Sequence, residues 1–423
     1  MSSSLTPRIA IIGLGGYAVW HHEAVRQLER SGEARLVCTC DPVLTEVAGK
    51  GPEWSLAARG IAVYPDYRAM LDRHGSELDV VIIPTPIALH AEMHREAVRR
   101  GLAVYLEKPP TLDPVELEQM IECDAAAPVP TLVGFNFIAE PLRQALKHRL
   151  YAGEFGELRA VRLLGLWPRS SAYYGRNGWA GRLVGYDGRL VLDSCVGNGL
   201  SHHVHNVLYW AAEGAERWAR PTQVRAWLAR ANPIQGADTF FIEARTDTGV
   251  PVRMALSHAC HGPEQHRETL VCADAEIDYV TKDRVRIRWR DGRLETLEVG
   301  DFDAQVENLR ALLACLRGER KRPPTTLADC RAFVELHALA YLSAGAIQTV
   351  PETEIVHVTG QPAASEYCSL KNIRETAERF LAEGGWPLVE PRPAGPAEIG
   401  GFEPLVRCLA RLAEAELHAE AAG

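Results

Sequence analysis

The first third of the chain alternates short apolar segments with amphipathic ones, and this alternation limits the possible folds more than any other feature. Extended segments are expected at 8–13, 34–41, 79–85, 102–106 and 131–134, with helices between several of them, for example at 88–100. Parallel strands need crossover connections, which are usually helical. The pattern therefore predicts an N-terminal doubly wound parallel sheet of the Rossmann type.

The pattern changes after about residue 155. Extended segments at 157–165, 223–231, 239–247, 251–260, 267–273 and 284–290 follow one another with few long helices, apart from those expected at 200–212 and 326–344. Such a series predicts an α+β domain with a large, open, mostly antiparallel sheet and helices on one face. We divide the chain into a nucleotide-binding domain at 1–134, a substrate and oligomerisation domain at 135–360, and a C-terminal helical accessory segment at 361–423.

Composition excludes several classes of protein. The 423 residues carry a formal net charge of −9, which argues against a nucleic-acid binder. No apolar run approaches the length of a membrane span, and the chain enters a strand almost at once, as a cytoplasmic protein does. The ten cysteines form no pair of C-x-x-C motifs, so we expect reduced core thiols.

A glycine-rich turn follows the first expected strand. It reads Gly13-Leu14-Gly15-Gly16-Tyr17-Ala18, the G-x-G-x-x-A arrangement in which a tight turn brings backbone N–H groups close to a pyrophosphate. Asp41 ends the second strand, where a carboxylate accepts hydrogen bonds from the ribose hydroxyls of NAD and repels the 2′-phosphate of NADP. The pair predicts bound NAD in preference to NADP. The alternative for Asp41 is a turn-forming residue before Pro42.

Two later strand ends carry further candidate residues. Glu107-Lys108-Pro109 follows the segment at 102–106, and Pro84-Thr85-Pro86, with His90 on the next helix, follows the segment at 79–85. Ligands collect at the carboxyl ends of strands in such sheets. A lysine there can orient a substrate hydroxyl and favour loss of its proton, although a solvated Glu-Lys pair before a helix is the competing interpretation.

These motifs, together with Gly134-Phe135-Asn136-Phe137, resemble the glucose-fructose oxidoreductase/inositol dehydrogenase/MocA (Gfo/Idh/MocA) family in order and approximate spacing. The resemblance covers residues 8–140 strongly and continues to about 350. It implies a Rossmann domain followed by an α/β domain, NAD(P)-linked redox chemistry on sugars or polyols, and a cofactor site that includes Asn136. It also implies a homodimer or homotetramer built through the open sheet.

The sequence departs from the family where an Asp-x-x-x-His motif is usual. His202 matches the family histidine, but Asn198 stands four residues before it, and Asp193 is the nearest carboxylate. A branch of the family has a similar Asp-Ser-x-x-x-Asn-x-x-x-His pattern, so the change can mark a subfamily. A histidine titrating near neutrality suits a base, so His202 is the first candidate, with Lys108 assisting.

The competing interpretation of His202 is a half-buried structural histidine. His203 and His205 lie close by in the sequence, but no cysteine or carboxylate completes a recognisable ligand set, so no metal is expected.

A loop at 173–182 precedes this segment and is rich in aromatic, Arg and Asn residues. Its Arg176 and Arg182 can pair with a carboxylate or phosphate, and Trp179 can stack on a sugar ring, with Asn177 beside them. A sugar acid is therefore one expected substrate. The alternative is a loop that contacts another subunit, where Trp, Tyr and Arg are equally common.

Three functions remain open at this point. The first is an NAD-dependent dehydrogenase or reductase acting on a carbohydrate, polyol or sugar acid. The second is a lyase or glycosidase that oxidises and re-reduces its substrate with bound NAD and no net redox change. The third is a nucleotide or sugar sensor without catalysis, which the asparagine at position 198 favours.

Overall fold

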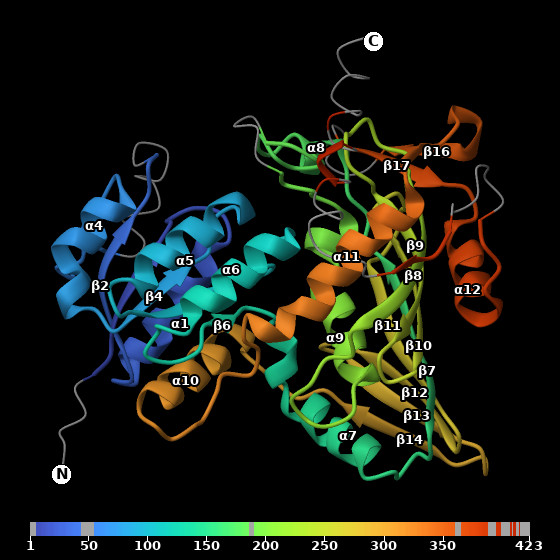
Figure 1. Cartoon of the computed structure of the whole chain (residues 1–423), viewed down its shortest axis with the longest axis horizontal. Coiled ribbons are helices and arrows are strands. Elements are labelled where there is room, and N and C mark those ends of the chain that lie inside the picture. Colours follow the sequence, from blue (N-terminus) through green and yellow to red (C-terminus); the bar gives the residue numbers. More distant parts are fainter. Residues whose placement is uncertain are drawn as a thin grey trace. The chain divides into compact units, whose positions relative to one another are not determined.

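The structure is a computed structural model of the chain that describes residues 6–43, 55–185, 190–359, 365–387 and 395–398, together with 407, 409–411 and 414. The described chain forms two compact units. The first comprises residues up to Thr111, Glu116–Glu140 and Phe302–Cys330, and the second comprises Leu112–Val115, Pro141–Asp301 and the chain from Arg331 onward. Figure 1 shows the elements of each unit along the chain.

The first unit is built on a six-stranded parallel sheet in the order β3-β2-β1-β4-β5-β6. The strands are β1 (Arg8–Ile12), β2 (Arg35–Cys40), β3 (Ala62–Tyr64), β4 (Val80–Ile83), β5 (Ala103–Leu106) and β6 (Leu132–Val133). The connecting helices are α1 (Ala18–Arg30), α4 (Tyr67–His74), α5 (His90–Val98) and α6 (Pro114–Asp124). Strands β4 and β5 are buried along their whole length, as expected for a sheet covered on both faces. The Rossmann prediction is confirmed.

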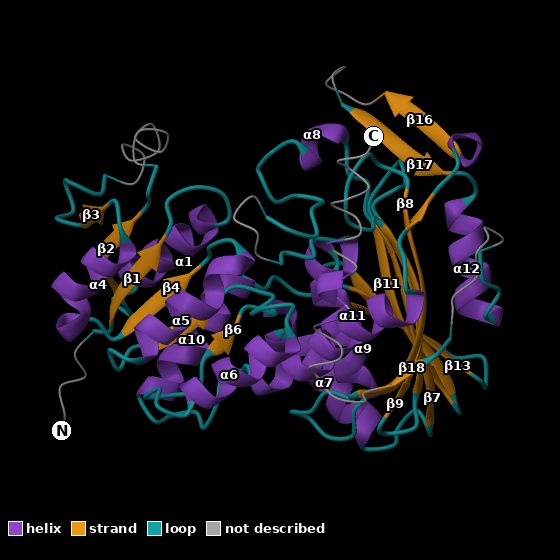
Figure 2. Cartoon of the chain, turned by 45° about the horizontal axis from the view of Figure 1, so that its top comes forward, coloured by secondary structure: helices purple, strands orange, loops and turns teal. Residues whose placement is uncertain are grey.

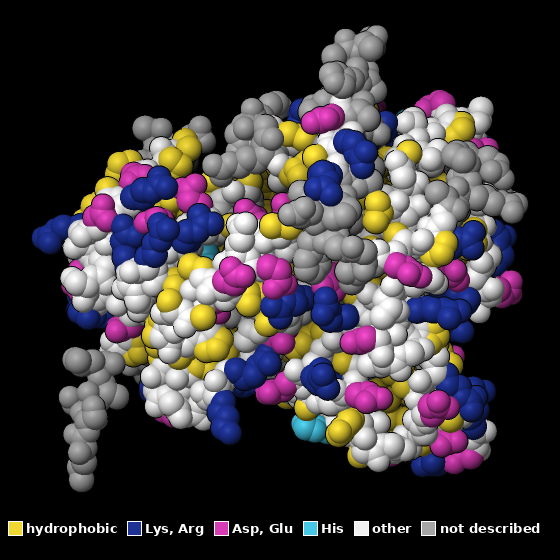
Figure 3. All heavy atoms as spheres, in the orientation of Figure 1, with side chains coloured by type: hydrophobic (Ala, Val, Ile, Leu, Met, Phe, Trp, Pro, Cys, Tyr) yellow, Lys and Arg dark blue, Asp and Glu magenta, His cyan; other side chains and the backbone are white. Residues whose placement is uncertain are grey.

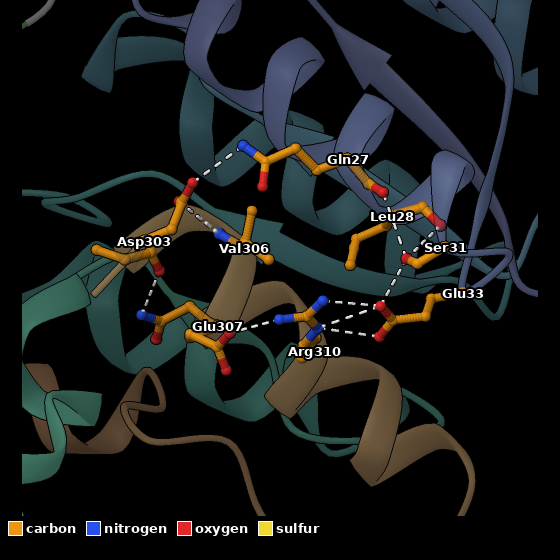
Figure 4. Close-up of polar contacts among 10 residues, drawn as sticks. Gln27, Leu28, Ser31, Glu33, Asp303, Val306, Glu307 and Arg310 are labelled. Atoms are coloured by element: carbon orange, nitrogen blue, oxygen red, sulfur yellow. Dashed lines mark hydrogen bonds and ion pairs between the residues drawn. The ribbon is translucent and has the colours of Figure 1, made fainter. Parts of the chain in front are cut away.

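Helix α10 (Ala304–Leu316) also belongs to the first unit, although it comes from a part of the chain that the sequence-based division placed in the second domain. Its apolar side chains Leu309, Leu312 and Leu313 join the core of β1, β4 and α1. At the surface, Arg310 contacts Glu33 with Nη2–Oε1 at 2.8 Å, and Gln27 Nε2 donates to Asp303 Oδ2 at 3.1 Å (Figure 4). These apolar contacts explain why α10 packs with the first unit: the sheet face beside α1 needs a second helix to bury its apolar side chains.

The second unit contains a ten-stranded sheet in the described chain, in the order β14-β13-β12-β11-β7-β10-β9-β8-β15 with β18 paired to β8. Its strands are β7 (Leu158–Leu166), β8 (Pro221–Arg230), β9 (Thr239–Thr246), β10 (Pro251–Ser257), β11 (Gln265–Cys272), β12 (Ala275–Val280), β13 (Arg284–Trp289), β14 (Leu294–Glu298), β15 (Gln348–Thr349) and β18 (Ala397–Glu398). Most pairs are antiparallel, but β7 with β10 and β8 with β15 are parallel. This confirms the mostly antiparallel sheet; β12 and β14 were not among the predicted strands.

Helices lie on both faces of this sheet, which corrects the expectation of helices on one face. Figures 1 and 2 show α9 (Ser201–Ala211) and α11 (Arg331–Ala344) on one side of the strands and α12 (Ile373–Glu383) on the other. Adjacent residues of β11 point to opposite sides. Glu268 accepts a hydrogen bond from Trp210 of α9, whereas Arg267 forms an ion pair with Glu378 of α12. Apolar side chains drive α12 onto the sheet, since Phe380 packs edge-on against Phe241.

The remaining elements of the second unit are α7 (Pro141–Tyr151), the short helix α8 (Ser171–Tyr174) and the hairpin of β16 (Ile355–Thr359) with β17 (Glu366–Leu370). The segment expected at 361–423 supplies β17, α12 and β18, and most of its Pro- and Gly-rich stretch at 390–401 lies outside the described residues. No helix of the described chain is both long and apolar enough to cross a membrane. On the face seen in Figure 3, basic and acidic side chains are interspersed.

Candidate functional site

The glycine-rich turn joins β1 to α1. Gly13 has φ +124°, and a Cβ built on it would lie 3.3 Å from the Cβ of Ala18, so a side chain at position 13 would be strained and would crowd Ala18. Gly16 has φ +56°, which also favours glycine, while Gly15 and Tyr17 complete the approach to the helix start. The resulting backbone leads into a helix N-terminus, the arrangement that binds pyrophosphate.

Asp41 lies at this turn in the folded unit. Its Oδ2 accepts a hydrogen bond from the backbone N–H of Leu14 at 2.9 Å, and its Oδ1 accepts one from Val43 at 3.0 Å. The carboxylate is therefore held beside the glycines, with lone pairs left to accept hydrogen bonds from a ribose. The turn fits the pyrophosphate of NAD, and Asp41 fits its ribose hydroxyls.

A buried histidine on α1 contacts the backbone of the glycine-rich turn. His22 Nε2 lies 3.0 Å from the carbonyl oxygen of Gly13, and burial lowers the pKa of His22 to about 4. A neutral ring can donate to that oxygen without placing a buried charge beside the cofactor site. The sequence did not single out this residue, although a polar side chain on the inner face of the first helix is a signal that could have found it.

Glu107 and Lys108 follow β5. Glu107 is buried and its Oε1 lies 2.8 Å from His21 Nε2. A Cβ on Gly134 would lie 2.9 Å from the same oxygen, so the glycine after β6 leaves room for this close approach. Lys108 is half-buried, its backbone N–H donates to Glu107 Oε2 at 3.2 Å, and its peptide bond to Pro109 is cis.

His90 and Asn136 hold these strand ends together. The two ring nitrogens of His90 lie 2.8 Å from the carbonyl oxygen of Thr85 and 3.0 Å from that of Pro109, and its side chain is fully buried. The ring thus ties the loop Pro84-Thr85-Pro86 to the loop after β5. Asn136 is equally buried and accepts a hydrogen bond from the Tyr105 hydroxyl at 2.7 Å. Both residues have positioning contacts in addition to the cofactor role proposed for them.

In the second unit, a π-helical turn (Cys195–Gly199) precedes α9. Asn198 lies in this turn and donates its Nδ2 to Asp193 Oδ1 at 2.9 Å, while Asp193 Oδ2 accepts the backbone N–H of Gly181 at 2.6 Å. The backbone of Asp193 also donates to the carbonyl of Arg182. The structure therefore brings together Asp193, Asn198 and the end of the loop at 173–182.

His202 is half-buried in the first turn of α9. Its neighbours face the interior: His203 Nδ1 lies 3.2 Å from Glu268, and burial lowers the pKa of His205 well below its usual range. The described residues contain no group of three or more side chains arranged to hold a metal ion. Lys108 belongs to the first unit and His202 to the second.

The loop at 173–182 contains an arginine stacked on aromatic rings. The guanidinium of Arg176 lies 3.5 Å from the ring centre of Tyr173 and 5.1 Å from that of Trp179. Asn177 accepts backbone hydrogen bonds from Trp179 and Ala180. Asn177 and Arg182 also line a hollow of about 300 Å³ in the second unit, whereas Arg176 and Trp179 do not line it.

A buried network that the sequence did not reveal fixes α9 to the sheet. Glu268 is completely buried and contacts Arg143, whose Nη1 lies 2.5 Å from Oε2. Asn206 and Trp210 of α9 donate to the two oxygens of the same carboxylate at 2.8 and 2.6 Å. These residues lie far apart in the sequence, so only the folded chain identifies the network. It fixes the helix that carries His202.

Comparison with known proteins identifies the class of the first unit. Residues 7–135 match the model of an oxidoreductase family with an NAD-binding Rossmann fold, named GFO_IDH_MocA. The class is therefore that of NAD-binding Rossmann domains from oxidoreductases. More particularly, this part of the chain belongs to the Gfo/Idh/MocA family, as the motifs implied.

Curated relatives and solved structures extend the likeness. The chain is 32% identical to scyllo-inositol 2-dehydrogenase (NAD(+)) of Bacillus subtilis over 152 residues, 36% of this chain and 42% of that protein. It is 25% identical to D-apiose dehydrogenase of Paraburkholderia graminis over 81% of this chain and 88% of that protein. The fold is similar, with TM-score 0.64 and 22% identity, to the WlbA dehydrogenase of Bordetella pertussis in complex with NADH and UDP-GlcNAcA, covering 80% of this chain and 96% of that one.

The extent of these matches differs along the chain. The chain spans 44% of the length of the inositol 2-dehydrogenase of Rhizobium meliloti and, as given above, less than half of the Bacillus enzyme. The sequence similarity to these two relatives is thus confined to part of each protein. The matches identify the cofactor domain.

Proposed function

We propose that this protein is an NAD-dependent oxidoreductase that transfers a hydride between nicotinamide and a hydroxyl-bearing carbon of a carbohydrate, polyol or sugar acid. The observation that carries the proposal is the Asp41 carboxylate held at the glycine turn by the Leu14 N–H, in a domain where Glu107 and Lys108 follow β5. The likeness to scyllo-inositol and D-apiose dehydrogenases supports a hydroxylated substrate.

We propose that His202 handles the proton of the substrate hydroxyl and that Lys108 contacts the oxygen of the same hydroxyl. In the oxidative direction His202 removes the hydroxyl proton of the substrate, and the Lys108 ammonium stabilises the negative charge that develops on the oxygen. NAD, when bound, supplies the acceptor for the hydride from the adjacent C–H bond. The substrate carbon becomes a carbonyl, two electrons and one hydrogen leave as the hydride, and the other proton stays on His202.

A spectrophotometric assay tests the proposal. NADH formation is followed at neutral pH with NAD and a panel of inositols, D-apiose, glucosides and uronic acids. Turnover of at least one compound with stoichiometric NADH is expected. Turnover that requires NAD without net NADH would replace this proposal with the lyase or glycosidase alternative. NAD binding without any turnover would replace it with a sensor.

Two substitutions test the assigned roles. His202→Asn and Lys108→Met each remove one group of the proton path, and we expect kcat to fall by about 10²- to 10⁴-fold with the Kd for NAD unchanged. The exposed residues His148 and Lys321 offer matched controls, His148→Asn and Lys321→Met, which should behave as the wild type. A His202→Asn variant with wild-type kcat would remove His202 from the mechanism.

The substrate's acidic group is a finer part of the proposal. Arg176 keeps guanidinium N–H groups available beyond the one that donates to the Tyr173 carbonyl, and Arg182 lines the hollow beside it. Arg176→Ala and Arg182→Ala should raise the KM for uronic acids more than for the matching neutral sugars. If the KM for every acidic substrate is unchanged, the sugar-acid assignment is wrong.

The proposal also covers how copies of the chain associate. We propose a homodimer or homotetramer that uses the open sheet; α12 already packs on β7–β10, so a contact between copies through that face would fall on β12, β13 and β14. Light scattering coupled to size exclusion measures the assembly.

Nine cysteines of the described chain are free thiols, which supports a reducing compartment such as the cytoplasm.

A further inference from the structure

Two buried histidines hold the residues on either side of Lys108. Glu107, which precedes it, has its Oε1 2.8 Å from Nε2 of His21 on α1. Pro109, which follows it, has its carbonyl oxygen 3.0 Å from Nδ1 of His90. Both histidines are only 1% exposed. The backbone of the candidate catalytic lysine is therefore anchored at both of its neighbours from inside the first unit.

The Glu107 carboxylate has a hydrogen-bond partner on each oxygen. Its Oε1 faces His21, and its Oε2 accepts the backbone N–H of Lys108 at 3.2 Å. A carboxylate accepts and does not donate, so Nε2 of His21 carries the hydrogen. The side chains of His21 and Glu107 are 1% and 7% exposed, and a buried carboxylate is costly unless it is hydrogen-bonded. His21 therefore stabilises a buried carboxylate directly beside Lys108.

Packing restricts the ring of His21 where it meets Glu107. Tyr105 lies edge-on to this ring with centres 4.9 Å apart, and Tyr17 lies edge-on to it at 5.8 Å. Gly134 leaves room for the carboxylate, since a Cβ there would lie 2.9 Å from Oε1 of Glu107. These contacts hold the ring and the carboxylate in the geometry that the hydrogen bond needs.

The position of His21 on α1 connects this contact with the cofactor turn. Helix α1 starts directly after the glycine-rich turn, and His21 lies in its first turn. The next residue, His22, has its Nε2 3.0 Å from the carbonyl oxygen of Gly13. Consecutive histidines of one helix thus contact the glycine-rich turn and Glu107. Because a helix is a rigid element, the turn and the loop after β5 are held in a fixed relation.

We propose that His21 is a positioning residue for the reaction. By holding the Glu107 carboxylate it fixes the backbone that carries Lys108, and through α1 it sets the lysine relative to the turn that binds the cofactor. His21 acts through Glu107 and contacts neither substrate nor cofactor. The inference rests on the proposed function and deepens it, because it explains how Lys108 keeps the position that its role requires. Small displacements of a catalytic group slow the chemical step, so the contact affects kcat more than substrate binding.

Two substitutions test this role by kinetics with NAD and a polyol that the wild type oxidises. His21→Phe keeps an aromatic ring against Tyr105 but removes the N–H, whereas His21→Gln keeps an N–H that can reach Glu107. We expect kcat to fall about 10- to 100-fold in His21→Phe, with a smaller change in KM, and to recover most of this loss in His21→Gln. If His21→Phe does not fold, His21→Asn, whose amide ends short of Glu107, replaces it.

Another buried histidine of the first unit provides the control for folding. His94 on α5 is fully buried, and its Nε2 lies 3.2 Å from Oδ1 of Asp124 and 3.0 Å from Oγ1 of Thr131. His94→Phe removes a comparable contact that does not involve Lys108. It should lower Tm, as His21→Phe does, and leave kcat as in the wild type. An equal loss of kcat in both variants would show that His21 acts only through general stability and would overturn the inference.

The reactivity of the Lys108 amine gives a measurement that needs no turnover. The full chain reacts with a trace of acetic anhydride, and mass spectrometry compares acetylation of Lys108 with that of the exposed Lys321. A lysine on a less fixed backbone is more open to the reagent. We expect this ratio to rise about 2- to 10-fold in His21→Phe, the factor that one lost hydrogen bond allows. It should return toward the wild-type value in His21→Gln and stay unchanged in His94→Phe.

The inference and the proposed function fail in different ways. If the wild type forms no NADH, the proposed function fails, and the acetylation ratio still decides whether His21 positions Lys108. The inference is overturned if His21→Phe has the wild-type ratio, or the wild-type kcat where turnover is found. It is also overturned if His21→Gln is as impaired as His21→Phe, because the hydrogen bond to Glu107 would then have no part in the effect.

Discussion

Asn198 donates its side-chain amide to the carboxylate of Asp193 across 2.9 Å, and the other oxygen of that carboxylate accepts the backbone N–H of Gly181. The negative charge missing from position 198 is therefore present one hydrogen bond away. Because Nδ2 faces Asp193, the asparagine is held by a charged partner, and its replacement by aspartate does not simply restore the usual acid.

Asn198→Asp should destabilise the protein in a pH-dependent way. It places two carboxylates in contact, which raises the pKa of one of them above its value in the unfolded chain. A raised carboxyl pKa means that the native state loses stability as pH rises through the ordinary carboxyl range. We expect a loss of about 1–3 kcal/mol at pH 8 and a smaller loss at pH 5, measured by urea unfolding. Asn372→Asp, at the exposed N-cap of α12, is the control; its new carboxylate lies at a helix N-terminus, so the stability of this variant should not fall as pH rises.

Asp41→Ala should change the cofactor preference. The substitution removes an acceptor for the ribose hydroxyls and the charge that repels a 2′-phosphate, so the Kd for NAD should rise by about tenfold or more while the Kd for NADP rises less or falls. Fluorescence titration with both nucleotides measures the ratio. Asp72→Ala, at an exposed ion pair with Arg100, should leave both Kd values unchanged. An unaltered ratio in Asp41→Ala would show that specificity is set elsewhere.

The buried pair of Arg143 and Glu268 predicts sensitivity to acid. Burial alone would raise the pKa of Glu268, but the charge of Arg143 and the hydrogen bond from His203 outweigh it and lower the pKa to about 2. The carboxylate therefore stabilises the protein above the unfolded-state pKa of about 4.3, and this contribution is lost as pH falls from there toward 2.

Glu268→Gln should lower the free energy of unfolding by about 3–5 kcal/mol at pH 7, because it leaves Arg143 buried without its counter-charge. The difference from the wild type should shrink as pH falls below 4. Urea unfolding at pH 7, 5 and 3.5 follows it. Glu276→Gln removes an exposed partner of Arg288 and should cost far less. A Glu268→Gln protein as stable as the wild type at pH 7 would contradict the prediction.

Phe380→Ala should loosen α12 from the sheet without affecting NAD. The ring is fully buried and packs against Phe241 and Trp386, with centroids 5.1 and 4.9 Å away. Large-to-small changes of this type cost about 3–5 kcal/mol. We expect faster proteolysis within residues 365–387 and a lower Tm, with an unchanged Kd for NAD. The exposed Glu383 supplies the control, Glu383→Ala. Resistance of Phe380→Ala to proteolysis at the wild-type level would contradict the assignment.

The sequence was most informative where local patterns set the structure. Strand β1, the glycine turn and the start of α1 form one contiguous segment, so hydrophobic periodicity and glycine positions were enough to predict them. The placement of Asp41 also followed, since it closes the next strand of the same sheet. For Lys108 the pattern indicated only its place after a strand, and its role in catalysis stays a prediction.

The pattern was less informative where distant segments meet. Helix α10 lies beside α1 through contacts between residues about 280 positions apart, such as Arg310 with Glu33. Helix α12 covers the second face of the sheet because Phe380 meets Phe241, a contact that no local periodicity indicates. The buried ion pair of Glu268 with Arg143 could not be predicted either, since a glutamate in a strand does not indicate whether it is buried or which residue it pairs with.

By itself, then, the sequence determined the nucleotide-binding half of the protein, because the turn, the strand end and the helix start that bind a dinucleotide are made by neighbours in the chain. Only the tertiary structure decided the contacts of Asp193, Asn198, Gly199 and His258. Asp193, Asn198 and Gly199 belong to one segment and His258 to another, and whether a polar side chain is paired depends on which segments fold against one another. The cofactor could be inferred from local patterns, whereas the contacts of these polar side chains depend on packing.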